Sequence, residues 1–135
     1  MKSFLVSNTS ARKHKAIYRE LGENAVFDLS PSQHGWDDFK SASIGDAIYV
    51  INERLRITLS YEITQISDGI LLEEDSGLAQ EVLSVTSGDV RVVFGKPLQR
   101  IDKEYPSFVR EHNIRNNKLN PDSHTMYVGF NCAAF

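Results

Sequence analysis

The residue types that most often perform catalysis are present in this sequence, but their spacing matches none of the common catalytic motifs. The four histidines, His14, His34, His112 and His124, form neither an HExxH nor an HxH pattern. Cys132 is the only cysteine, which excludes a disulfide within one chain and a thiolate-rich zinc site. The chain also has no GxSxG and no Walker lysine motif. We therefore expect a binding module with no metal or cofactor, rather than an enzyme.

The single tryptophan is the best candidate for direct contact with a ligand. Trp36 follows a loop of polar and turn-forming residues, 30–35, instead of lying within an apolar strand. An aromatic ring at such a position can wall a pocket for a planar group, and stacking of a base on it contributes about 1–3 kcal/mol. The alternative is that Trp36 only covers the core. The acidic residues at 37–38 and 73–75 are interpreted as solvated loop charge.

The net charge of −3 is unevenly distributed along the chain. Residues 1–20 carry five basic side chains against one acidic, and residues 90–135 carry seven against four. Residues 21–89 carry three basic side chains against thirteen acidic. The chain as a whole cannot bind nucleic acid through bulk charge, but its two ends could form a local basic face if they meet in the fold.

The hydrophobic pattern predicts a β-rich chain with a few short helices. The clearest strands are 47–52 and 56–66, joined by a short connection that indicates a hairpin. In the second of these, apolar residues alternate until the phase slips at Gln65, which predicts a β-bulge. Further strands are predicted at 4–6, 25–27, 70–72, 82–85, 90–94 and 126–130, with Pro97 ending the fifth of these, and helices at 11–21, 36–41 and 105–113.

These elements favour one α+β domain spanning residues 1–135. Short strands without a repeating strand–helix–strand rhythm suggest a small closed or half-open β-barrel with two or three peripheral helices. No apolar run is long enough for a membrane span, and the N-terminus does not resemble a signal peptide. With a single cysteine and no export signal, we expect a cytoplasmic protein.

The order of the motifs resembles the PUA-like superfamily and, within it, the EVE-like domains related to YTH and ASCH domains. The resemblance rests on a first strand that ends in the serine-containing loop 7–10 and on the Gly-Trp-Asp-Asp-Phe stretch at 35–39. It also rests on Ile44-Gly45-Asp46 before a strand, and on the returning strand that ends at 61–66. The longer Trp- and Arg-rich stretch of many EVE domains is absent, which leaves the second wall of a pocket undefined.

The resemblance implies a small PUA-like β-barrel that reads a modified base, most often in DNA, flipped into an aromatic-lined pocket. Such a domain would be the sensor of a restriction or defence system, with a nuclease or NTPase on a fused or partner domain. By position, the base pocket would use Ser7, Asn8, Trp36, Tyr49 and Tyr61. The basic side chains that could bind phosphate are Arg12, Lys15, Arg19, Arg91, Lys96, Arg115 and Lys118.

Two other functions remain open from the sequence. The first is an ASCH-like hydrolase of modified nucleosides, for which Lys40, Thr58 and Glu62 supply suitable residue types without a distinctive spacing. The second is a protein-interaction domain of a larger assembly. Turnover of a modified nucleoside would indicate the hydrolase, and a lack of nucleic acid affinity at low salt would indicate the interaction domain.

Overall fold

One curled β-sheet organises the chain. The computed structural model describes residues 1–7, 18–68, 91–123, 125–126 and 129–135. The sheet has seven strands in the order β2-β3-β6-β5-β4-β1-β9. Their bounds are β1 Ser3–Ser7, β2 Tyr18–Leu21, β3 Asn24–Leu29, β4 Ala47–Ile51, β5 Arg56–Asp68, β6 Arg91–Glu104 and β9 Cys132–Ala134. All neighbouring strands are antiparallel except β1 and β4, which are parallel.

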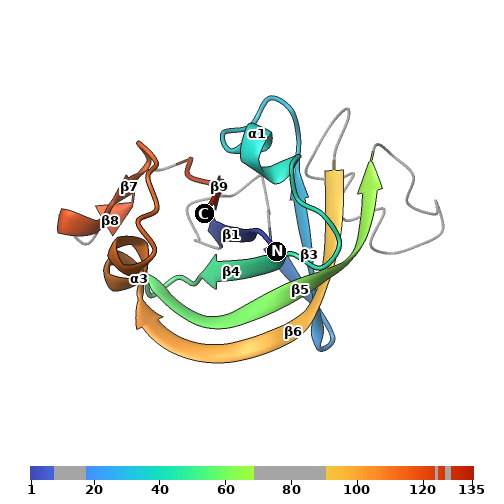
Figure 1. The fold of residues 1–135 in the computed structure, drawn as a ribbon, viewed down its shortest axis with the longest axis horizontal. Coiled ribbons are helices and arrows are strands. Elements are labelled where there is room, and N and C mark those ends of the chain that lie inside the picture. Colours follow the sequence, from blue (N-terminus) through green and yellow to red (C-terminus); the bar gives the residue numbers. More distant parts are fainter. Residues whose placement is uncertain (8–17, 69–90, 124, 127–128) are drawn as a thin grey trace.

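The sheet bends because its two longest strands are irregular. In Figure 1, β5 and β6 bow together beneath the rest of the molecule. Their pairing shifts register at three places, and one of these lies between Ile63 and Gln65, where the sequence pattern predicts a bulge. Each shift adds local twist and bends the strands. The α+β class is confirmed, and the sheet is a half-open barrel whose edge strands among the described residues are β2 and β9.

Short helices lie at the ends of this sheet. Helix α1 spans Trp36–Phe39 and helix α3 spans Tyr105–Glu111, with Pro106 in its first turn as predicted. A small ribbon of β7 (Leu119–Asn120) and β8 (Thr125–Met126) flanks the 3₁₀ helix η1 (Pro121–Ser123) beside α3. None of the helices in the described ranges is long and apolar enough to cross a membrane.

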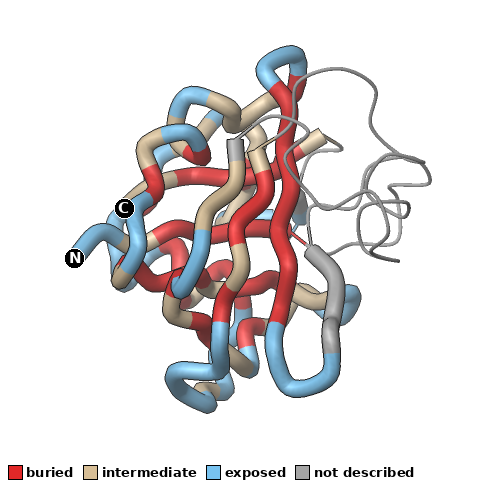
Figure 2. The backbone as a smooth tube through the Cα atoms, turned by 90° about the vertical axis from the view of Figure 1, so that its right-hand side faces the viewer, coloured by how far each residue is buried: buried red, intermediate tan, exposed pale blue. Residues whose placement is uncertain are grey.

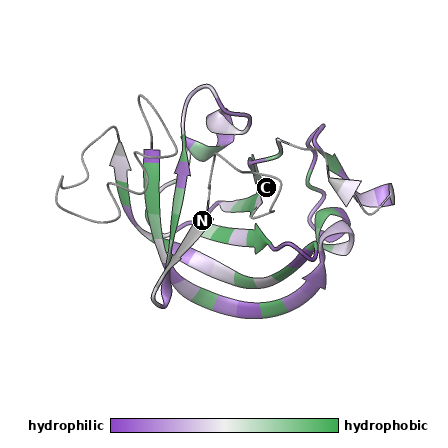
Figure 3. Ribbon diagram, turned by 180° about the vertical axis from the view of Figure 1, so that it is seen from behind, coloured by the Kyte–Doolittle hydropathy of each residue, from purple (hydrophilic) through white to green (hydrophobic). Residues whose placement is uncertain are grey.

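Both faces of the central strands are buried. One apolar cluster contains Phe4 and Ile48, and a second cluster, packed around α3, contains Leu5 and Ile51. Successive residues of β1 and β4 therefore face different clusters, as strand geometry requires. Buried backbone follows these strands in Figure 2, and hydrophobic residues gather on them in Figure 3, whereas the second half of β6 is largely hydrophilic.

The Gly-Asp motif has a structural role at the start of β4. Gly45 has a φ of 94°, which favours glycine. The buried carboxylate of Asp46 accepts hydrogen bonds from the backbone N–H of Lys2 at 2.9 Å and of Ser43 at 2.9 Å. The motif thus fixes the beginning of β1 against the beginning of β4.

Several predicted elements need correction or fall outside the described residues. The helix predicted at 11–21 is wrong at its end, because Tyr18–Leu21 pairs with β3 as a strand; its first part, like the strands at 70–72 and 82–85, is outside the described residues. Pro97 does not end the strand begun near residue 90, because a register shift in β6 accommodates it. The strand predicted at 126–130 is described only at Met126, in β8, and β9 was not predicted.

Candidate functional site

A surface hollow beside Trp36 is the best candidate site in the described part of the chain. Its volume is about 350 Å³, within the usual range for small-molecule sites. The loop before α1, the first residues of α1 and one residue from the segment after α3 form its walls. The lining residues are Pro31, Gln33, His34, Gly35, Trp36, Asp37, Asp38 and Asn116. In the view of Figure 1, α1 lies above β9 and the segment after α3 lies to its left.

Two hydrogen bonds hold the α1 segment against the C-terminal strand. The side chain of Asn131 donates to the carbonyl of His34 at 2.7 Å, and the carboxylate of Asp38 accepts the backbone N–H of Ala134 at 3.0 Å. Asn131 is buried, and its carbonyl also accepts the N–H of Ser7 at 3.2 Å. The end of β1, the α1 loop and β9 therefore meet at the base of the hollow.

Gly35 allows the closest approach in this region. Its φ is 89°, and a Cβ at this position would lie 2.7 Å from the carbonyl oxygen of Cys132 and 2.8 Å from its nitrogen. A side chain here would force α1 away from β9, because both neighbours are backbone atoms. The Gly-Trp sequence thus places the indole at the hollow by letting the preceding residue contact the strand.

A tight turn fixes the orientation of the Gln33 amide. The side-chain oxygen of Gln33 accepts hydrogen bonds from the backbone N–H of Ser30 at 2.8 Å and from its hydroxyl at 3.0 Å. Gln33 is only 7% exposed. Its NH₂ group has no acceptor among the described residues, while the side chain lines the hollow.

The segment after α3 forms the facing wall and is anchored by apolar side chains. Ile114 and Leu119 are buried in the cluster around α3. Between them, the side-chain oxygen of Asn116 accepts the backbone N–H of Lys118 at 2.9 Å. This arrangement holds Asn116 at the hollow, with Arg115 exposed beside it.

The hollow combines one aromatic surface with polar and acidic groups. Trp36 is half-buried and packs against the core, so the indole is neither fully enclosed nor fully solvated. Asp37 pairs with Lys40 at 3.2 Å on the outer side of α1. The Nδ1 atom of His34 is buried and has no hydrogen-bond partner in the described part of the chain. Such a set can stack a planar ring and hydrogen-bond its edge.

The residues predicted to form the base pocket are only partly brought together. Trp36 lines the hollow, and Ser7 lies beneath it through its contact with Asn131. Asn8 lies outside the described residues. Tyr49 and Tyr61 do not line the hollow, so this part of the predicted pocket is corrected.

Strand alternation explains why the two tyrosines are absent from the hollow. Tyr61 is 2% exposed and packs edge-on against Phe27 inside the curled sheet, with ring centroids 5.7 Å apart. Tyr49 faces the opposite side of the sheet, where it packs against Phe108 at 5.1 Å and Phe135 at 5.7 Å. The register pairs Tyr61 with residue 48, not with Tyr49, so the two rings point to opposite faces.

The predicted phosphate-binding residues also separate into different surroundings. The guanidinium of Arg91 donates to the carbonyl oxygens of Phe39 at 2.9 Å, Ala42 at 3.0 Å and Lys40, so it supports the end of α1. Lys96 pairs with Glu62 at 3.3 Å on the sheet. These two residues are therefore corrected to structural and surface roles.

The remaining basic candidates lie near the ends of the chain. Arg115 and Lys118 flank Asn116 in the wall of the hollow. Arg19 lies on β2, not on a helix, and its side chain is not described. Arg12 and Lys15 lie outside the described residues.

The three residue types considered for a hydrolase do not converge. Lys40 pairs with Asp37 on α1, and Glu62 pairs with Lys96. Thr58 is exposed on β5, four residues from Glu62, which corresponds to about 13 Å along a strand. Within the described ranges, no group of three or more histidine, cysteine, aspartate or glutamate side chains is placed to hold a metal ion.

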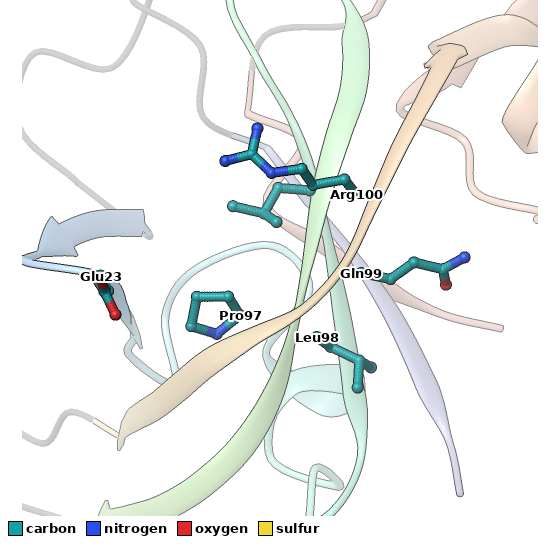
Figure 4. A pocket seen from close by; sticks show the side chains of 6 residues that line it. Glu23, Pro97, Leu98, Gln99 and Arg100 are labelled. Carbon is teal, nitrogen blue, oxygen red and sulfur yellow. The ribbon is translucent and has the colours of Figure 1, made fainter.

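A second hollow lies where β6 passes the β2–β3 turn. Its volume is about 400 Å³, and Figure 4 shows Pro97 between Glu23 and the rest of β6. A register shift of the β5–β6 pair falls here, between Ser60 and Tyr61. The lining residues are Glu23, Leu59, Pro97, Leu98, Gln99 and Arg100. The lining lacks an aromatic ring, so this hollow is less suited to a planar ligand.

The polar wall of the main hollow was not predicted. Gln33, Asp37 and Asp38 were interpreted as loop residues, because nothing in their spacing distinguishes a lining side chain from a solvated one. The available signal was their position within three residues of Trp36. His34 was interpreted only as one of four isolated histidines.

Comparison with known proteins gives little similarity. No protein-family model matches the chain, and no curated protein matches its sequence significantly. A crystal structure of a mutant ZmASCH protein from Zymomonas mobilis aligns over 90% of this chain and 86% of its own, with 9% identity and a TM-score of 0.45. This similarity is too low to assign the chain to a family.

Proposed function

We propose that this protein is a binding module for nucleic acid that holds a modified base in the hollow beside Trp36. The observation that carries the proposal is a half-buried indole in a hollow of about 350 Å³ whose other lining groups are mostly polar. Binding sites of this kind join an apolar surface with a few polar groups that fix orientation. A flat heterocycle fits this combination, because its faces are apolar and its edges carry hydrogen-bonding groups.

The polar lining suits the edge of a base better than it suits a phosphate. Asp37 and Asp38 place negative charge at the hollow, which disfavours an anionic group there. A carboxylate accepts hydrogen bonds from the exocyclic amine of a base. The amides of Gln33 and Asn116 can donate or accept. We therefore place the base in the hollow and the phosphates outside it.

The phosphates flanking the base would contact the wall formed after α3. Arg115 and Lys118 lie on either side of Asn116 along the chain. Contacts from these side chains would position the strand without reading its sequence. In duplex DNA the base must first leave the stack at a cost of a few kcal/mol, which stacking on Trp36 and the edge contacts would offset.

A panel of short single-stranded oligonucleotides tests the proposal. Each carries one central 5-methylcytosine, 5-hydroxymethylcytosine, N6-methyladenine or unmodified base, and binding is measured by fluorescence anisotropy at low and moderate salt. We expect tighter binding to one modified form. Trp36→Ala should abolish that preference and leave weak, salt-sensitive binding, because base stacking is lost while phosphate contacts remain.

Charge reversal separates the base from the phosphates. Arg115→Glu with Lys118→Glu should weaken binding to modified and unmodified DNA alike and reduce the salt dependence. The matched control is Arg54→Glu, which reverses an exposed charge in the β4–β5 turn, away from the hollow. If Trp36→Ala keeps the preference, the base does not bind in this hollow. If no oligonucleotide binds at low salt, the domain binds protein instead.

A further inference from the structure

Two amide groups on facing walls of the hollow have their oxygens occupied by neighbouring backbone. The oxygen of Gln33 accepts two hydrogen bonds from Ser30, and the oxygen of Asn116 accepts one from the N–H of Lys118. In both cases a backbone N–H is the donor, so the atom facing it must be the oxygen and not the nitrogen. The NH₂ groups are therefore turned away from these backbone segments.

Neither NH₂ group has an acceptor among the described residues, although both side chains line the hollow. The case is strongest for Gln33, which is 93% buried and yet does not have its NH₂ sealed inside the protein. A buried donor without a partner costs about 1–3 kcal/mol. Such a cost is tolerated where a water or a ligand supplies the missing acceptor.

We infer that Gln33 is a specificity-determining residue that donates a hydrogen bond from its NH₂ group to an acceptor on the edge of the bound base, with Asn116 as a second donor from the facing wall. This inference rests on the proposed function and adds the polarity of the site. Ser30 prevents the Gln33 amide from rotating to present its oxygen instead. The ligand must therefore present an acceptor, such as a ring carbonyl or a ring nitrogen, at that position.

The carboxylate of Asp38 complements these two donors. One of its oxygens accepts the N–H of Ala134, which fixes the carboxylate at the hollow. The second oxygen can accept from an exocyclic amine. The site then offers donors from Gln33 and Asn116 and an acceptor from Asp38, so it favours an edge on which acceptors outnumber amine donors.

The central test is the substitution Gln33→Glu. It keeps the oxygen that Ser30 contacts but replaces the donor by a second acceptor. We expect affinity for the preferred oligonucleotide to fall about 10- to 100-fold, since one charge-compatible donor is lost and two acceptors now face each other. Asn116→Asp should produce a smaller loss in the same direction, because Asn116 is half-buried.

Asn52→Asp is the matched control. The oxygen of Asn52 accepts the backbone N–H of Arg54 at 2.9 Å and of Arg56 at 3.1 Å, in an arrangement like that of Gln33 but in the β4–β5 turn. This substitution should leave affinity unchanged. Thermal denaturation of all three variants checks that each is folded.

Direct observation of the amide does not depend on any variant folding. In proton–nitrogen correlation spectra, the two NH₂ resonances of Gln33 should move when the 5-methylcytosine or N6-methyladenine oligonucleotide binds, and those of Asn52 should not. Binding with unmoved Gln33 resonances, or with unchanged affinity in a folded Gln33→Glu variant, overturns the inference while leaving the proposed function intact. A complete lack of binding overturns the proposed function and with it this inference.

Discussion

Replacing Gly35 by alanine should open the hollow while leaving most of the sheet in place. The added Cβ would lie 2.7 Å from a carbonyl oxygen and 2.8 Å from a nitrogen of Cys132, distances that real Cβ atoms essentially never show. Because both atoms are backbone of a buried strand, α1 must move instead. Its movement would break the contacts of His34 with Asn131 and of Asp38 with Ala134.

The size of the effect follows from these contacts. A neutral hydrogen bond contributes about 0.5–1.5 kcal/mol and one to a charged group about 1.5–3 kcal/mol. Losing both would lower the free energy of unfolding by roughly 2–4 kcal/mol. The positive φ adds about 1–2 kcal/mol of backbone strain. The midpoint of thermal unfolding should therefore fall by roughly 10 °C or more.

Gly45→Ala separates the backbone strain from the close approach. Gly45 has nearly the same φ, 94° against 89°, but nothing lies within 4 Å of the position of its added Cβ. This variant should lose only the strain and should leave the emission of Trp36 unchanged. Gly35→Ala should in addition shift that emission to the red, because the indole becomes more solvated. Equal midpoints for the two variants would show that the approach of α1 to β9 contributes nothing.

Three further perturbations test the framework around the hollow. Arg91→Met should destabilise the protein by about 2–4 kcal/mol in urea unfolding, because three carbonyls at the end of α1 lose their donor; an effect below 0.5 kcal/mol would contradict this role. Burial raises the pKa of Tyr105 above its ordinary value of 10.0, although the hydrogen bond to Asn120 opposes this, so its neutral form contributes stability that is present below pH 10 and is lost as the pH rises further. Tyr105→Phe should flatten that alkaline loss, as urea titrations above pH 9 would reveal. Burial also raises the pKa of the Cys132 thiol, with a smaller contribution from Asp38, so iodoacetamide should modify Cys132 only at the rate of unfolding, and fast labelling of the native protein would contradict its burial.

The sequence predicted those elements whose side chains alternate strongly. The strands β4 and β5, their hairpin and the bulge near Gln65 follow from a period of two that the apolar residues state directly. β2 was mistaken for the end of a helix because Tyr18–Leu21 alternates too briefly to distinguish the two periods. β9 was missed because the small residues after Cys132 carry no periodic signal, although the backbone of this strand pairs with β1.

The site was predictable only in its aromatic part. A lone tryptophan after a polar loop is visible in a sequence, whereas the choice of Tyr49 and Tyr61 needed the register of two strands, which composition does not supply. The N–H groups that orient Gln33 and the strand that contacts Gly35 belong to the backbone, and backbone partners leave no trace in residue type. Arg91 could not be distinguished from a phosphate-binding residue for the same reason, since the oxygens that it contacts are carbonyls.

The C-terminal strand therefore determines the shape of the hollow although it contributes none of the residues that line it. Within the segment 131–134, one side chain holds the α1 loop, one backbone unit sets the closest approach and one N–H orients a carboxylate. The same strand pairs with β1, whose end leads to Ser7 beneath the hollow. Since a wall displaced by about 1 Å can cost a hundredfold in a positioned interaction, changes in this strand should alter binding by Trp36 and Gln33 before they unfold the sheet.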